Sequence, residues 1–117
     1  MTDRIPTEHE EQREVVKWFR QTYKEVRIFA IPNGEKRTIG VAARLKVEGV
    51  SPGVPDLYAP AWKLWVEMKR IKDSQVSPAQ KDWHTYLRGL GDTVLVCKGA
   101  AEAKEQIIKF KKEKYGN

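Results

Sequence analysis

The stretch GVPDLYAPAWKLWVEMKR, residues 53–70, contains two apolar segments joined by a short connection. Asp56 precedes the first segment, whereas Glu67 and Lys69 close the second one. Because side chains alternate between the two faces of a strand, Glu67 and Lys69 share one face. A hairpin through residues 60–62 would place Asp56 opposite the end of the second strand, near Glu67. The stretch therefore predicts two carboxylates and an ammonium group around a common point.

Such a group of charges has two explanations. Two converging carboxylates suit Mg²⁺, which is usually held by one or two carboxylates and takes further ligands from water and substrate phosphate. A lysine beside them can position or help deprotonate an attacking water, or offset the charge that develops on a phosphorane. The alternative is a surface salt bridge between Glu67 and Lys69, which would contribute well under about 1 kcal/mol. The pattern by itself favours the salt bridge, because it arises by chance in many proteins.

The bulk composition predicts one globular domain over residues 1–117. The chain has 40% hydrophobic and 32% charged residues, enough for a core without disulfides or metal staples. The single cysteine, Cys97, indicates a reducing compartment, so we expect a cytoplasmic protein without a membrane span. A net charge of +6 suggests a polyanionic partner, although part of the excess comes from the terminal KFKKEK.

The remaining pattern predicts an α/β fold with a small mixed β-sheet flanked by helices. Helices are expected over residues 7–24, 36–48, 77–89 and 100–114, and strands over 25–31, 56–59, 63–69 and 92–97. Thr7 and Glu10 form a capping-box pattern, Ser77 is the expected N-cap before Pro78, and Gly49 is the expected C-terminal glycine. The strand over 92–97 is apolar enough to be buried on both faces.

Two helices carry polar residues within their apolar stripes. The stripe of the first helix consists of Val15, Val16, Phe19 and Tyr23. Gln12 lies at its centre and Glu8 close to it, whereas Glu10, Glu11 and Glu14 are expected to point away. In the third helix, Gln80 shares a stripe with Trp83, His84 and Leu87. Glu8 would equally suit a solvated first turn, and a first-turn glutamine is usually half-exposed, but one shared site explains both irregularities together.

Several segments together resemble the VRR-NUC domain, the virus-type replication-repair nuclease module of the PD-(D/E)XK superfamily. They are EHEEQREVVKWF, IPNGEKR, AARLKVEGVSPGVPDLYAP, WVEMKR and VSPAQKDWHTYLRGLGDTVLVCKGAAEA. Their order follows the family from about Glu8 to Ile108. The resemblance implies a restriction-endonuclease-like core in the order α-β-α-β-β-α-β-α. Stand-alone copies of this length are similar to those of bacteriophages and prophages.

The resemblance also implies roles for individual residues. Pro55 and Asp56 match the PD of the family motif, and Glu67 and Lys69 match its (D/E)XK. The implied catalytic residues are Asp56, Glu67, Lys69, Glu8 and Gln80. The implied ligands of Mg²⁺ or Mn²⁺ are Asp56, Glu67, Glu8 and the carbonyl of Met68. Gln80 is an orienting residue in this scheme, and Gln12 could tether Glu8.

The predicted function is that of a Mg²⁺- or Mn²⁺-dependent DNA endonuclease that cuts branched DNA such as a Holliday junction. By analogy with junction-resolving nucleases we expect a homodimer or a higher homo-oligomer. Candidate DNA-binding residues are Lys36, Arg37, Arg44, Arg70 and Lys72, each of which could equally belong to a solvated face. Candidate dimer-surface residues are Trp18, Trp62 and Trp83, some of which core packing would explain. The alternative function is a non-catalytic basic module that binds DNA or protein.

Overall fold

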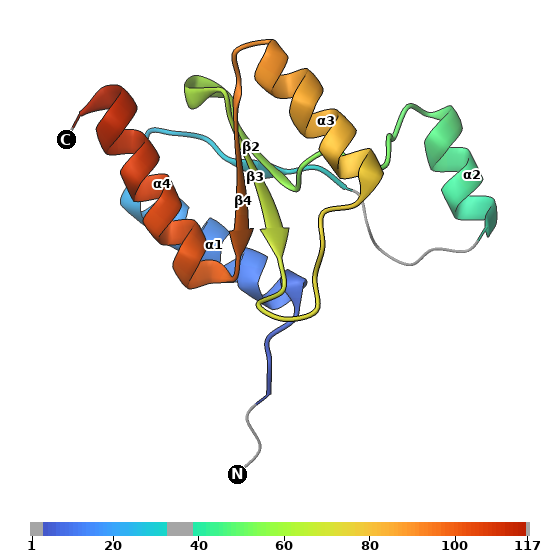
Figure 1. The fold of residues 1–117 in the computed structure, drawn as a ribbon, viewed down its shortest axis with the longest axis horizontal. Helices are drawn as coiled ribbons and strands as arrows, with labels where there is room; N and C mark the ends of the chain where they lie inside the picture. The colour runs from blue at the N-terminus through green and yellow to red at the C-terminus, as the bar shows by residue number, and fades with distance from the viewer. Residues whose placement is uncertain (1–3, 33–38, 117) are drawn as a thin grey trace.

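The computed structural model describes residues 4–32 and 39–116, and it has the predicted α/β architecture (Figure 1). Its elements are α1 (Glu8–Thr22), β1 (Phe29–Ala30), α2 (Ile39–Val47), β2 (Leu57–Ala59), the 3-10 turn η1 (Pro60–Trp62), β3 (Leu64–Lys69), α3 (Pro78–Gly89), β4 (Thr93–Lys98) and α4 (Ala100–Tyr115). Apart from the added 3-10 turn, this order is the predicted one. The fold class inferred from the sequence is therefore confirmed.

The four strands form one mixed sheet in the order β1-β2-β3-β4. β2 pairs antiparallel with both β1 and β3, whereas β3 and β4 run parallel. The turn η1 closes the predicted hairpin, with Leu57 opposite Val66. Asp56 and Glu67 flank this pair in the chain, so the register brings them side by side. The hairpin prediction is confirmed.

The first strand is shorter than its alternating sequence predicts. Only Phe29 and Ala30 pair with β2, instead of the whole of residues 25–31. Before them, the guanidinium of Arg20 donates a hydrogen bond to the carbonyl of Ile28 at 3.1 Å. The amide of Val26 donates to the carbonyl of Tyr23 in a turn. These contacts satisfy the backbone that a longer strand would have placed in the sheet.

The two faces of the sheet are covered by different helices (Figure 1). α1 and α4 lie together on one side, and the apolar side chains of β3 join their core. That core includes Val15, Phe19, Leu57, Leu64, Val66, Met68, Cys97, Ala103 and Ile107, all fully buried. α3 lies on the other side, next to β4. The polar face of β3, with Glu67 and Lys69, therefore lies beneath α3 rather than in open solvent.

Helix boundaries follow the local signals. Thr7 accepts a hydrogen bond from the amide of Glu10 and the side chain of Glu10 accepts one from the amide of Thr7, so the capping box is confirmed. Ser77 caps α3 in the same way, with Gln80 as the reciprocal partner. At the end of α2, Gly49 has φ +103° and its amide donates to the carbonyl of Lys46. This is the left-handed C-terminal position that glycine occupies at low cost.

Glu11 corrects the predicted orientation of the first helix. It was expected to point away from the core, yet it is 8% exposed and its carboxylate accepts a hydrogen bond from the amide of Ala100 at 3.1 Å. The first amides of a helix lack intrahelical partners, and α4 has no side-chain cap of its own. Glu11 therefore fills that role from another helix, which offsets the cost of burying its carboxylate.

β4 and the tryptophans also differ from expectation. β4 pairs only with β3 among the described strands, and Leu95 and Val96 on it are half-buried rather than buried. Side chains from the flanking helices bind its outer edge, including Arg88, which donates to the carbonyl of Val94 at 2.8 Å. Of the proposed dimer-surface tryptophans, Trp62 is buried in the core, and Trp18 and Trp83 are half-buried. Trp62 packs against aromatic rings of α1 and α4 and is therefore unavailable to a partner.

Candidate active site

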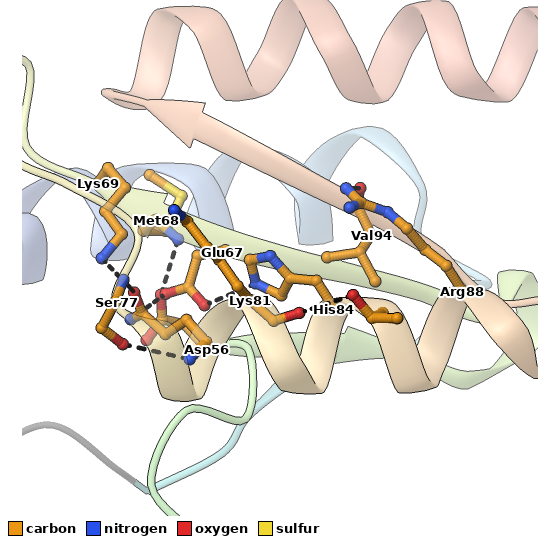
Figure 2. A network of polar contacts seen from close by, with 11 residues as sticks. Asp56, Glu67, Met68, Lys69, Ser77, Lys81, His84, Arg88 and Val94 are labelled. Atoms are coloured by element: carbon orange, nitrogen blue, oxygen red, sulfur yellow. Dashed lines mark hydrogen bonds and ion pairs between the residues drawn. The ribbon is translucent and has the colours of Figure 1, made fainter.

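Asp56, Glu67 and Lys69 meet at the end of the β2–β3 hairpin (Figure 2). The carboxyl group of Asp56 lies beside that of Glu67, and Asp56 Oδ2 accepts a hydrogen bond from the amide of Met68 at 2.7 Å. Lys69 Nζ donates to Gln80 Oε1 at 2.8 Å. Glu67 is 1% exposed and Lys69 is 6% exposed. The predicted convergence is present, and a surface salt bridge does not describe it.

Gln80 connects the lysine to the acid pair. Its Nε2 donates to Glu67 Oε2 at 3.2 Å while its Oε1 accepts from Lys69. The same Oε1 accepts from the amide of Ser77 at 2.8 Å, as the second half of the α3 capping box. The cap therefore fixes the amide orientation that serves the site. Gln80, which interrupts an apolar helix stripe in the sequence, therefore connects β3 to α3 in the structure.

His84 is a site residue that the sequence analysis placed in a core stripe and did not assign to the site. It lies one turn after Gln80 on α3, is 3% exposed, and its Nε2 is 3.3 Å from Glu67 Oε1 (Figure 2). The two oxygens of Glu67 are thus held by two residues of one helix. The sequence signal that could have identified His84 is its spacing of four residues from Gln80, because residues four apart share a helix face and Gln80 was already a candidate site residue.

The electrostatics of the site are dominated by burial. Burial raises the pKa of Glu67, and the neighbouring Asp56 carboxyl raises it further. The pKa of Asp56 is raised as well, by burial, against the opposing effects of its hydrogen bonds and of Lys69. Burial lowers the pKa of His84, and the charges of Arg88 and Lys69 add to that effect. A neutral His84 makes its contact with Glu67 a hydrogen bond rather than an ion pair.

The donor set fits a divalent cation. The raised pKa values of Asp56 and Glu67 favour retention of a proton by the pair, because two adjacent negative charges in a poorly solvated site repel. A cation in place of that proton would relieve the repulsion, and Mg²⁺ takes one or two carboxylates. No group of three His, Cys, Asp or Glu side chains within residues 4–32 and 39–116 is arranged to hold a metal. Asp56 and Glu67 are the two carboxyl side chains of the site that could hold such an ion, with further ligands from water or substrate.

Two further predicted site residues, Glu8 and Gln12, lie on α1. Glu8 is exposed in the first turn of α1, and its charge contributes only the last of the effects on the pKa of Glu67. Gln12 is half-buried. Cys97 is fully buried, and burial raises the pKa of its thiol to about 12, so packing rather than thiolate chemistry accounts for it.

The predicted DNA-binding residues that the structure describes have different environments. Lys36 and Arg37 lie outside the described residues. Arg44 is exposed on α2, 3.9 Å from Glu48, and Lys72 is exposed beyond β3. Arg70 directly follows β3 and is half-buried, and its Nε is buried without a hydrogen-bond partner in the described structure.

Fold and site together define a small mixed α/β domain with a half-buried Asp56, a buried Glu67 and a buried lysine at the end of a hairpin. A solved structure described as a "VRR_NUC domain protein" is similar to this chain, with a TM-score of 0.73 and 28% identity. The match covers 93% of this chain and 91% of that chain. The chain is thus similar in fold and in sequence to a VRR-NUC domain, the family that its sequence motifs resemble. No family model and no curated protein matches the chain.

Proposed function

We propose that the domain is a metal-dependent DNA endonuclease. The observation that carries this proposal is the cluster of half-buried Asp56 with buried Glu67 and Lys69, in which Gln80 binds both Glu67 and the ammonium group. The likeness to a VRR-NUC domain supports a nuclease-type function for this cluster. Asp56 and Glu67 have raised pKa values and lie next to the ammonium group of Lys69, and such perturbed acids are common in catalytic sites.

Asp56 and Glu67 would hold Mg²⁺ or Mn²⁺. The bound ion would supply Lewis-acid activation of the phosphate and a bound water of lowered pKa. Lys69 is held 2.8 Å from Gln80 Oε1, which fixes its ammonium group beside the acids. There it orients the attacking water or offsets the negative charge that develops on the phosphate. Because Lys69 is 6% exposed, this charge acts in a poorly solvated site, where preorganised electrostatic stabilisation is strongest.

DNA is the proposed substrate because the chain carries a net charge of +6. Phosphate contacts account for most sequence-independent affinity, and a basic domain suits them. Within this proposal the preferred DNA is branched, with a four-way junction as the leading candidate. A homodimer would place two sites about a two-fold axis and so match the symmetry of such a junction.

A non-catalytic binding module is the second candidate. The observation that favours it is that each of the central polar groups already has a protein partner: Asp56 binds the amide of Met68, and Glu67 binds Gln80 and His84. A protonated acid pair within such a network is a stable structural element without metal. This candidate predicts DNA binding that is indifferent to chelation and no cleavage at all.

A cleavage panel separates the two candidates. Labelled four-way junction, flap, single strand and duplex are incubated with Mg²⁺, with Mn²⁺ or with EDTA. The nuclease predicts cleavage only with metal, and its loss in Lys69→Met, which keeps the apolar stem of the side chain. Lys112→Met, an exposed position on α4, serves as the matched control and should retain activity. Absence of cleavage of every substrate by the folded protein in both metals would refute the enzymatic proposal.

No helix within the described ranges is both long and apolar enough to cross a membrane.

A further inference from the structure

A cationic hollow lies at the β1 edge of the sheet, away from the acid pair. The residues that line it are Arg20, Lys24, Val26, Arg27, Ile28 and Phe29. Its three cationic residues and Phe29 are exposed, Phe29 by 44%. The lining, taken over the described residues, includes no acidic side chain. The hollow therefore combines positive charge with an accessible aromatic ring.

The walls of the hollow are held in place by the fold. Arg20 Nη2 donates to the carbonyl of Ile28 at 3.1 Å, which fixes the guanidinium at one wall. The ring of Phe29 packs edge-on against Tyr58, with centroids 5.9 Å apart. Tyr58 stacks on Trp65 at 4.0 Å. These three rings form a row across β1, β2 and β3, in which Tyr58 and Trp65 restrict the position of Phe29.

The aromatic row runs next to the acid pair. Trp65 precedes Glu67 by two residues on β3, and Tyr58 follows Asp56 by two residues, so each ring shares a strand face with its acid. Two residues of a strand span about 7 Å. Phe29 lies opposite Tyr58 in the register. A ligand in contact with Phe29 would therefore lie one row of side chains away from the candidate active site.

Packing within the sheet explains the inner rings but not the outer one. Cross-strand aromatic pairs stabilise sheets, and Tyr58 and Trp65 are accordingly half-buried. Phe29 stands exposed on a two-residue edge strand, beside Lys24 and Arg27. An exposed ring bordered by cations matches the sites that hold single-stranded nucleic acid, in which bases stack on aromatic rings while cations bind the phosphates.

We propose that this hollow, the Phe29 hollow, binds an unpaired segment of nucleic acid, with a base against Phe29 and phosphates at Arg20, Lys24 and Arg27. As a statement about substrate it rests on the proposed nuclease function. The unpaired segment continues along the aromatic row toward Asp56 and Glu67. Among branched substrates, those with unpaired nucleotides beside the cleaved phosphate, such as a flap, should accordingly bind more tightly than a fully paired junction.

Binding in EDTA tests the hollow without any need for catalysis. The affinity of the whole chain for a labelled single-stranded oligodeoxynucleotide and for its duplex is measured by fluorescence anisotropy. Phe29→Ala and Phe29→Leu are expected to weaken single-strand binding by about tenfold, which corresponds to the loss of one stacked base, and to leave duplex binding within about twofold. Phe29→Tyr keeps the aromatic face and should retain the affinity of the parent chain.

Tyr86→Leu, at an exposed aromatic position on α3, is the matched control and should change neither affinity. Unchanged single-strand affinity in Phe29→Leu would overturn the inference, as would an equal loss on single strand and duplex. Arg27→Gln should weaken single-strand binding and lower its salt dependence by about one phosphate contact. Loss of single-strand affinity in the Phe29 variants together with no cleavage in Mn²⁺ would refute the nuclease and leave the hollow standing.

Discussion

The loop before Asp56 gives a prediction whose size can be worked out from the structure. Gly53 has φ +95°, and a Cβ at this position would lie 2.6 Å from both the carbonyl carbon and the carbonyl oxygen of Ala79. Those atoms belong to the first turn of α3, immediately before Gln80. The close approach therefore sets the distance between the acid end of β2 and the helix that orients Glu67. Gly53→Ala would force the loop and the helix apart.

Two costs add in Gly53→Ala. The backbone conformation, unfavourable for a side chain, costs about 1–3 kcal/mol. The collision with backbone atoms costs about 1–3 kcal/mol more, as for other insertions into well-packed sites. Gly49→Ala is the matched control, because Gly49 has φ +103° and open space around the position of its Cβ. The difference between the two variants isolates the collision.

Urea denaturation of both variants measures that difference. We expect Gly53→Ala to lose about 1–3 kcal/mol more unfolding free energy than Gly49→Ala, because the conformational cost is common to both. Cleavage activity, if present, should fall in Gly53→Ala under conditions in which the variant is folded. Equal destabilisation of the two variants would show that the contact with Ala79 places no restraint on the loop.

Three further predictions concern buried polar groups. Glu11→Ala should destabilise the fold by about 1–2 kcal/mol in thermal or urea unfolding, because the amide of Ala100 loses its partner. Glu14→Ala, which removes only an exposed ion pair, should cost under about 1 kcal/mol. Equal effects would contradict the helix-capping role of Glu11. His84→Leu should weaken Mn²⁺ binding, measured by calorimetry, about tenfold or more, while His84→Gln should retain more affinity because its amide can replace the hydrogen bond to Glu67. Identical losses would rule out orientation of Glu67 by that bond. The pKa of Glu67 is raised in the folded state, so its contribution to stability is fully present below its unfolded pKa and is lost as pH rises through its folded pKa. In EDTA, the unfolding free energy of Glu67→Gln should therefore increase relative to that of the parent chain as pH rises. Parallel pH profiles of the two unfolding free energies would refute this.

Much of the fold was accessible from sequence because its signals are local. The reciprocal caps at Thr7 and Ser77, the left-handed glycine Gly49 and the hairpin through residues 60–62 depend on neighbours in the chain. Strand alternation also predicted that Glu67 and Lys69 share a face, and the hairpin register then brought Asp56 beside them. Each of these inferences needs only the chemistry of a few consecutive residues and the geometry of one element.

Other features depended on contacts between helices and strands that are distant in the chain. Glu11 is buried because α4, 89 positions away in the chain, needs a cap at its first turn. His84 contacts Glu67 because α3 crosses the polar face of β3, and Phe29 is exposed because β1 forms an edge of the sheet. Sequence determined the elements and the residue types available for a site, since backbone preference and side-chain period act locally. Tertiary packing determined which of those residues lie side by side and how deeply they are buried, because desolvation and long-range hydrogen bonds depend on segments that are distant in the chain.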